Sequence, residues 1–473
     1  MRINISEYKE HYHDKKSGKL IDNWQEGIRI LPFTSNPISA IDKSGGITGA
    51  TGLFFRLFED DDVKAIEDFQ ETEAIVKSFL IEERKMDEHQ ADEFINMLRD
   101  IMMVNGTLNV TDVAFLKYIP PVPKDDLISE KNKKKYKAGQ TKIANFLYSM
   151  TADDFILSDQ DSKNIFTQLL KDSLSSNTSG LGKKKTTEEE YYVLPFIKRT
   201  FNEDLAWLLK QDSSAIVRYI HLLLHFYSCY AILQALPKLS YKQDDVSRPT
   251  KYYFILKSEK ASVTHDAVMT WKQILPKHYL DRIFGHSQAL DILNCVLGGN
   301  VGFYSDIKNE IEKTPFEENK DDCEELLRLY QEEKRYVFSQ RSSESASIDE
   351  IETDVNSYEE FFQKFEKLCC GLQSPSYISR MRKKVIDLLC MRFLQLRRGN
   401  YVLVLDNEML VFLIAMLTKN KRTKLDDLYK RFVDYGIVFN RGSRIAIEAY
   451  LMKLNLLDRK SDSGEAQYVK VIL

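Results

Sequence analysis

The sequence predicts a mainly α-helical, multi-domain protein that ends in a small module of helices and strands. The 473-residue chain contains only 19 Gly and 11 Pro, fewer turn-forming residues than an all-β chain of this length needs. Apolar residues recur along it at spacings of three and four, which is typical of amphipathic helices. The hydrophobic fraction of 43% supplies a packed core, and the length corresponds to roughly two to four domains.

The first region opens with a segment rich in Pro, Ser, Thr and Gly, residues Leu31–Gly52, which predicts a loop. Two later stretches, Asp62–Phe79 and Asp87–Met103, each have an apolar and a charged face, and each predicts a helix. Prolines between Pro120 and Pro123 then interrupt the chain before a basic run over Lys131–Lys137.

The middle region contains the most apolar stretch of the chain, Ala215–Leu236. Asp212 or Ser213 caps a helix there, and Pro237 ends it. The stretch is long enough to cross a bilayer, but its polar side chains would be costly in lipid, so we interpret it as a buried core helix. Residues Lys251–Lys257 (KYYFILK) predict a short β-like segment. The polar residues of the apolar stretch are Arg218, His221, His225 and Gln234.

Two polar, low-complexity segments divide the chain, because they bury too little apolar surface to offset their ordering entropy. They run from Ser173 to Glu190 and from Ser339 to Ser357. The resulting division is a mostly helical N-terminal region (1–172), a flexible linker or loop (173–190), a central helical domain (191–338), an acidic flexible connector (339–357) and a C-terminal helical region (358–473).

The end of the C-terminal region, about residues 403–473, predicts three helices followed by a β-hairpin. Asp406 caps a helix that ends at Thr418, and Leu425–Tyr435 and Arg441–Leu454 form the next two. A hairpin with its tip at Ser461–Gly464 closes the chain. This is the order of a winged helix-turn-helix, so we expect a winged-helix-like module. The positions of its third helix that we expect in the core are Ile445, Ile447, Ala449, Leu451 and Leu454.

Charge is distributed unevenly and points to this module. Asn309–Glu360 carries a net charge of −11, whereas Arg380–Leu473 carries +9. In winged helices the third helix commonly enters the major groove, and Lys and Arg neutralise phosphates. Two alternatives stay open. The module docks on proteins, which includes contact of its basic surface with the acidic region of the same chain, or it is a structural cap. The candidate DNA-binding residues are Lys419, Lys421, Arg422, Lys424, Arg441, Arg444, Arg459 and Lys460.

Motifs for catalysis do not emerge from the sequence. The glycine-rich Ser44–Gly52 lacks the Lys of a Walker loop, and no G-x-S-x-G elbow occurs. His221 and His225 share a helical face, but HLLLH lacks the Glu of a zinc-protease helix, which favours a hydrogen-bonding or helix-packing role. Short E-x-K strings are expected by chance in a chain with 29% charged residues. We therefore expect no catalytic residue, no cofactor and no metal.

The cysteines and the first residues of the sequence indicate the cellular compartment in which the protein is expected. Six cysteines occur without a C-x-x-C pair, which argues against a disulfide framework or a zinc ribbon and favours a reducing cytosol. The first residues, MRINISEYKEHYHDKK, lack the apolar region of a signal peptide. We expect a cytoplasmic protein without a membrane anchor.

Three strings of this sequence together resemble a known family. They are LNLLDRKSDSGEAQYVKVIL at the C-terminus, IVRYIHLLLHFYSCYAILQAL in the middle and FLYSMTADDFILSDQ at Phe146–Gln160. The chain resembles, over most of its length, the DptG family, also called DndG, of DNA phosphorothioation-dependent restriction systems.

The resemblance implies a role in bacterial anti-phage defence. Such systems mark host DNA by replacing a non-bridging phosphate oxygen with sulfur, and a three-component complex attacks DNA that lacks the mark. The resemblance implies partner proteins with P-loop ATPase or translocase activity and no catalytic residue in this component. We expect a non-catalytic subunit that contacts double-stranded DNA and bridges those partners. The alternatives are a pure protein scaffold and a divergent nuclease subunit.

Overall fold

The computed structural model is mainly helical, as the sequence predicts. Sixteen α-helices and two 3-10 helices occur among the residues that it describes. Those residues are 1–22, 29–32, 47–59, 63–66, 69–104, 107–122, 129–152, 168–169, 172–174, 191–242, 245–259, 265–274, 279–299, 302–341, 348–459 and 467–473.

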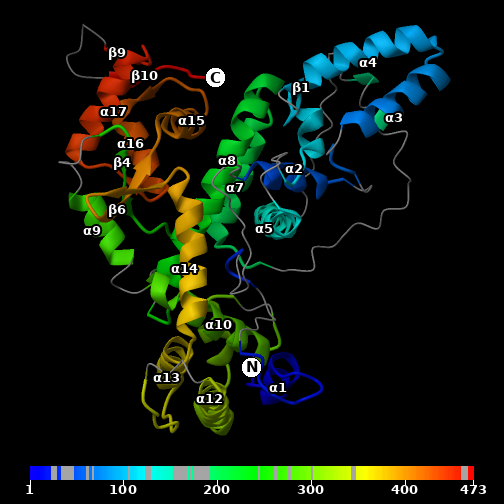
Figure 1. Ribbon diagram of the computed structural model, residues 1–473. Helices are drawn as coiled ribbons and strands as arrows, with labels where there is room; N and C mark the ends of the chain where they lie inside the picture. Colours follow the sequence, from blue (N-terminus) through cyan, green and yellow to red (C-terminus); the bar gives the residue numbers. More distant parts are fainter. Residues whose placement is uncertain are drawn as a thin grey trace.

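The apolar stretch of the middle region forms α8 (Ser213–Ala235), the centre of the molecule (Figure 1). The Asp212 side chain accepts a hydrogen bond from the Ala215 N–H at 2.8 Å, which confirms the expected cap. Among the described residues, this is the one helix long and apolar enough to cross a membrane, and 83% of its apolar window is buried inside the fold. That burial matches the core helix predicted from the sequence.

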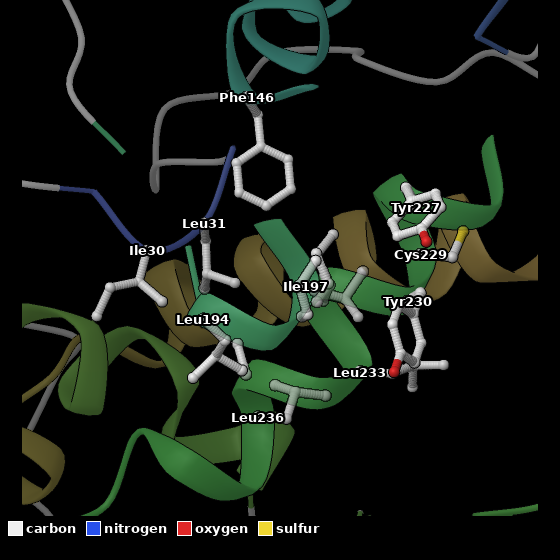
Figure 2. Close-up of a cluster of buried hydrophobic side chains, with 14 of the residues drawn as sticks. Ile30, Leu31, Phe146, Leu194, Ile197, Tyr227, Cys229, Tyr230, Leu233 and Leu236 are labelled. Atoms are coloured by element: carbon white, nitrogen blue, oxygen red, sulfur yellow. The ribbon is translucent and has the colours of Figure 1, made fainter. Parts of the chain in front are cut away.

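Segments from the whole length of the chain surround α8. Its neighbours include helices from the N-terminal, central and C-terminal regions. In Figure 2, Leu31 and Phe146 of the N-terminal region lie above Ile197 of the central region, and the α8 residues Tyr230 and Leu233 lie to the right of Ile197. One cluster of buried apolar residues thus runs through all three regions. The packed neighbours are α2 (Thr48–Arg56), η1 (Val113–Tyr118), α5 (Glu130–Tyr148), α7 (Pro195–Leu208), η2 (Leu236–Lys238), α14 (Pro375–Cys390) and α15 (Asn407–Thr418).

Helix α2 corrects the loop expected over Leu31–Gly52, because it begins at Thr48. Two glycines of that segment serve close helix packing. A Cβ on Gly49 would lie 2.3 Å from the Pro121 carbonyl oxygen, and one on Gly52 would lie 2.4 Å from that of Ile119. Glycine at these two positions therefore lets α2 pack closely against the segment Ile119–Pro121 that follows η1. A larger side chain would prevent this approach.

The helices predicted near residues 62–79 and 87–103 form an antiparallel pair with a small core of its own. The first starts later than predicted, because residues 63–66 are not helical and the Ile66 N–H donates to the Tyr118 carbonyl at 2.9 Å. This pair lies at the upper right of Figure 1. Its elements are α3 (Phe69–Glu82), α4 (Glu88–Met102), β1 (Met103–Val104) and β2 (Thr107–Leu108).

The N-terminal segment, residues 1–22, lies at the opposite end of the molecule from this helix pair and packs against α10 and α12 (Figure 1). The buried carboxylate of Asp22 accepts hydrogen bonds from Lys334 Nζ and Arg341 Nη2, both at 2.6 Å. The Tyr8 hydroxyl donates to Glu333 at 2.8 Å. The elements here are α1 (Ile5–Tyr12), α10 (Tyr279–Val296), α11 (Tyr304–Ile311), α12 (Phe316–Ser339) and α13 (Tyr358–Gly371).

The predicted flexible segments are described only in part. Residues 175–190 of the linker and 342–347 of the connector lie outside the described residues. Residues 348–357 differ from a flexible connector, because they pack along α12. The Gln331 side chain there exchanges two hydrogen bonds with the backbone of Ile351, and Val355 is fully buried.

The C-terminal region combines helices with three small sheets, and residues 252–256 complete two of them. The KYYFILK segment forms the strands predicted for it, which pair in parallel with β8 and β6. The sheet orders are β4-β6-β5, β3-β8 and β7-β10-β9. The elements are β3 (Tyr252–Tyr253), β4 (Ile255–Leu256), α9 (His265–Ile274), β5 (Leu394–Arg397), β6 (Asn400–Leu405), β7 (Thr423–Lys424), α16 (Leu425–Asp434), β8 (Ile437–Val438), α17 (Arg441–Lys453), β9 (Leu457–Arg459) and β10 (Gln467–Val469).

A buried carboxylate fastens this region to the centre. Asp204 of α7 is 1% exposed and accepts hydrogen bonds from the hydroxyls of Tyr227 at 2.6 Å and Tyr435 at 2.8 Å. Lys419, the residue after α15, forms an ion pair with it. Burial raises the pKa of Asp204, and the lysine and the two phenols partly oppose that effect.

Replacing Asp204 with Ala should destabilise the protein by about 2–4 kcal/mol, because the buried Tyr227 hydroxyl loses its acceptor and Lys419 its partner. D204N keeps an acceptor oxygen of the same shape, so its loss should be clearly smaller. Urea unfolding of both variants measures the difference. Equal stability of D204A and the unmodified chain would remove Asp204 from this role.

The buried His225 of α8 predicts a loss of stability in acid. Burial lowers its pKa to about 4, and its Nε2 lies 3.5 Å from the Leu388 carbonyl. In the unfolded chain His225 binds a proton below a pH of about 6.5, whereas in the folded chain it stays neutral down to a pH of about 4. The free energy of unfolding therefore falls as the pH drops from about 6.5 to 4. H225Q should lose about 2 kcal/mol less than the unmodified chain between pH 7 and 5 in urea unfolding.

The exposed His265 provides the matched control, since its side chain is 88% exposed. H265Q should leave the pH dependence of stability as it is in the unmodified chain. An identical effect of the two substitutions would contradict the role assigned to His225.

Candidate nucleic-acid interface

The candidate DNA-binding residues lie on a module of three helices and one antiparallel sheet. Along the chain α15, β7, α16, β8, α17, β9 and β10 follow one another, and β10 pairs with both β7 and β9. The register places Lys424 opposite Tyr468, and Tyr468 opposite Asp458. These three side chains share one face of the sheet, because directly opposed residues in a ladder point the same way.

Three basic residues gather around this sheet face. The Arg422 guanidinium lies over the Tyr468 ring at 4.5 Å and pairs with Asp458 at 3.6 Å. Lys421 and Lys424 are exposed on either side of Arg422 in the sequence. The structure therefore brings together three of the candidates, with Arg422 held in a fixed orientation by stacking.

The structure does not place Lys419 with the other candidate DNA-binding residues. Its ammonium pairs with the buried Asp204 and lies 5.2 Å from the Trp207 ring centroid. A side chain held in this way fastens the module to α7 and is not presented to a nucleic acid. The sequence places it in the basic turn KNKR, but its partner is more than 200 residues away in the chain.

Arg441 and Arg444 lie at the other end of α17 from the sheet. The helix is about 20 Å long, and its last turn leads into β9. Arg441 is exposed as the first residue, whereas Arg444 stacks on the Tyr429 ring at 4.7 Å. At this end Ser443 Oγ donates to Glu259 Oε2 at 3.1 Å, so a carboxylate lies beside the arginines.

The remaining two candidates are placed incompletely. Arg459 is the last residue of β9, opposite Gln467 of β10, and only its backbone is described. Lys460 lies outside the described residues, as does the hairpin tip Ser461–Gly464.

Several apolar residues of α17 are exposed on its outer face, which corrects part of the predicted core. Ile447 and Leu451 are fully buried, but Ile445 is 59% exposed and Leu454 41% exposed. Ala449 is exposed as well. The sequence pattern did not separate the two faces, because apolar residues occupy both.

Ile445, Ala449 and Met452 form a stripe along this outer face, at spacings of four and three, and Met452 is 42% exposed. Exposed Arg441 precedes the stripe by one turn. A surface of this kind suits a partner that buries apolar side chains, whether a protein or the edges of thymine bases.

The acidic region is located away from the basic module. The α12 carboxylates Glu318, Glu325 and Glu333 pair with Arg2, Lys9 and His13 of the N-terminal segment. In Figure 1 this helix lies at the bottom, and α16 and α17 lie at the upper left.

The described residues contain no group of three or more His, Cys, Asp and Glu side chains that could hold a metal ion. No family model and no curated protein among those compared matches the chain.

The two faces of α17 predict different responses to the same substitution. I445S should change the free energy of unfolding by at most about 0.5 kcal/mol, because the side chain is exposed. I447S should cost about 3 kcal/mol, since it places a hydroxyl and a void in the core. Urea unfolding measures both, and a large loss for I445S would show that Ile445 is covered.

Proposed function

We propose that this chain is a non-catalytic subunit of a bacterial phosphorothioation-dependent DNA restriction complex. In this proposal it contacts double-stranded DNA through residues 403–473 and bridges cytoplasmic partner proteins that carry P-loop ATPase or translocase activity. The resemblance of three sequence strings to the DptG family supports the choice of system. The arrangement of the C-terminal module supports the contact with DNA.

The observation that carries the DNA contact is the combination of module topology and charge. Three helices, a short strand after the first, and an antiparallel sheet of order β7-β10-β9 are consistent with the winged helix that the sequence predicts. Lys421, Arg422 and Lys424 flank the sheet, and Arg441 begins the third helix. Side chains of this type bind phosphates and fix a protein on the duplex without reading its sequence.

A pure scaffold is the second candidate, and the stripe on α17 favours it. Ile445, Ala449 and Met452 would be buried well by an apolar protein surface. In that reading the same helix docks on a partner subunit, and DNA is contacted elsewhere in the complex.

Fluorescence anisotropy with a labelled duplex separates the two. The purified chain should bind with an affinity that falls steeply between 50 and 200 mM salt, roughly 10³–10⁵-fold for six to ten phosphate contacts. The triple variant K421E/K424E/R441E should bind more weakly and lower the slope of log affinity against log salt by about three units. A plain and a phosphorothioated duplex tested in parallel report whether the chain distinguishes the mark.

K15E/K16E/K19E is the matched control, because it makes the same charge change on exposed lysines near α1. That variant should keep the salt slope of the unmodified chain. An equal loss in both triple variants would mean that only net charge matters, and no binding at 50 mM salt would favour the scaffold.

A further inference from the structure

A cavity of about 560 Å³ lies in the lower part of the molecule, away from the basic module. Its walls come from four places: α13, the start of α10, the segment Ser240–Lys242 that follows η2, and Ile348. Its volume falls in the range of sites that hold small organic molecules. It is therefore large enough for a ligand of roughly nucleotide size.

The floor of the cavity is a cluster of a thiol, an imidazole and a carboxylate. Cys370 lines the cavity and is partly exposed. Its Sγ lies 3.6 Å from Nδ1 of His286, and the same Nδ1 lies 3.3 Å from Glu366 Oε2. His286 is 2% exposed, so the imidazole is behind the thiol rather than in solvent.

The cluster is held in place from two sides. Glu366 accepts hydrogen bonds from Ser240 Oγ at 3.1 Å and from the Tyr241 N–H at 2.6 Å. Gly285, beside His286, lies so close to α13 that a Cβ there would be 2.6 Å from the Cα of Cys370. The close approach of α10 and α13 at this glycine sets the His286–Cys370 distance.

The surroundings of His286 and Cys370 shift the pKa values of both groups. Burial opposes protonation of His286, but Cys370 and Glu366 outweigh it and raise its pKa to about 10. Burial raises the pKa of Cys370, and His286 partly counteracts this. Shifted titratable groups lining a cavity are typical of functional sites.

The rim of the cavity is positively charged. Lys242, Arg282 and Lys367 line it, and all three are exposed. Glu359 acts on Lys242 from the same helix as Lys367, and Glu366 already contacts His286 and accepts hydrogen bonds from Ser240 and Tyr241. The balance at the opening is therefore cationic, which suits a phosphate group bound by Arg and Lys.

We propose that this cavity is a binding site for a small phosphate-bearing molecule, with Lys242, Arg282 and Lys367 receiving the phosphate and Cys370 in contact with the bound molecule. The cavity shares no residue with the proposed DNA-contacting surface. This proposal therefore does not depend on the proposed contact with DNA.

The alkylation rates of Cys370 test the charge of the cavity in the intact chain. Iodoacetate is an anion and iodoacetamide is neutral, and both add to a thiolate with loss of iodide. The ratio of the iodoacetate rate to the iodoacetamide rate should be about fivefold or more higher at Cys370 than at Cys390, because the rim attracts the anion. Cys390 is the internal control, since it is exposed outside the cavity, and mass spectrometry resolves the two sites.

Variants and ligand probes complete the test. R282Q/K367Q should bring the ratio at Cys370 to that at Cys390, whereas K364Q should not, because Lys364 lies on the same helix but pairs with Glu360 outside the cavity. Millimolar pyrophosphate or AMP should slow iodoacetamide at Cys370 and not at Cys390, against sodium chloride of equal ionic strength. Stronger protection by AMP identifies a nucleotide, and stronger protection by pyrophosphate identifies a simple polyphosphate.

Equal reagent ratios at the two cysteines would overturn the proposal. Protection of neither cysteine, or of both equally, by pyrophosphate and AMP would also overturn it. Loss of DNA binding in the charge-reversal variants of the C-terminal module would leave these results unchanged.

Discussion

The requirement to bury α8 on all sides organises the molecule. Most of its residues are apolar and buried, and a helix of that kind is stable in water only when other elements enclose it. Helices α2 and α5 of the N-terminal region, α7 of the central region, and α14 and α15 of the C-terminal region all pack against it. The largest core therefore includes residues of all three regions and crosses the boundaries that the polar segments suggest.

The position of the C-terminal module follows from this core. Helix α15 is itself almost entirely apolar and packs on α7 and α8, which brings Lys419 to Asp204 and Tyr435 to the same carboxylate. The parallel pairing of residues 252–256 with β8 and β6 fixes the module from a second direction. Its sheet of order β7-β10-β9 and the outer face of α17 remain on the outside, where partners can reach them.

Local signals in the sequence predicted local structure well. Asp212 and Asp406 cap the helices expected of them, because an N-cap depends on contacts within one turn. Other features depend on residues far apart in the chain. The helix at Gly49 needs Pro121, the role of Lys419 needs Asp204, and Cys370 meets His286 across 84 positions. Periodicity also predicted Ile445 to be buried, because it cannot tell which of two apolar faces the core will use.

The central position of α8 has a consequence for synthesis of the chain. About 170 residues separate the end of α8 from the start of α15, one of the helices that cover it. A ribosome adding roughly 5–20 residues per second needs about 9–34 s to make that length. During this interval α8 lacks the cover that α15 provides in the folded protein. Apolar surface that is exposed in this way promotes aggregation, so the order of the elements along the chain makes the nascent protein most vulnerable between the synthesis of α8 and that of α15.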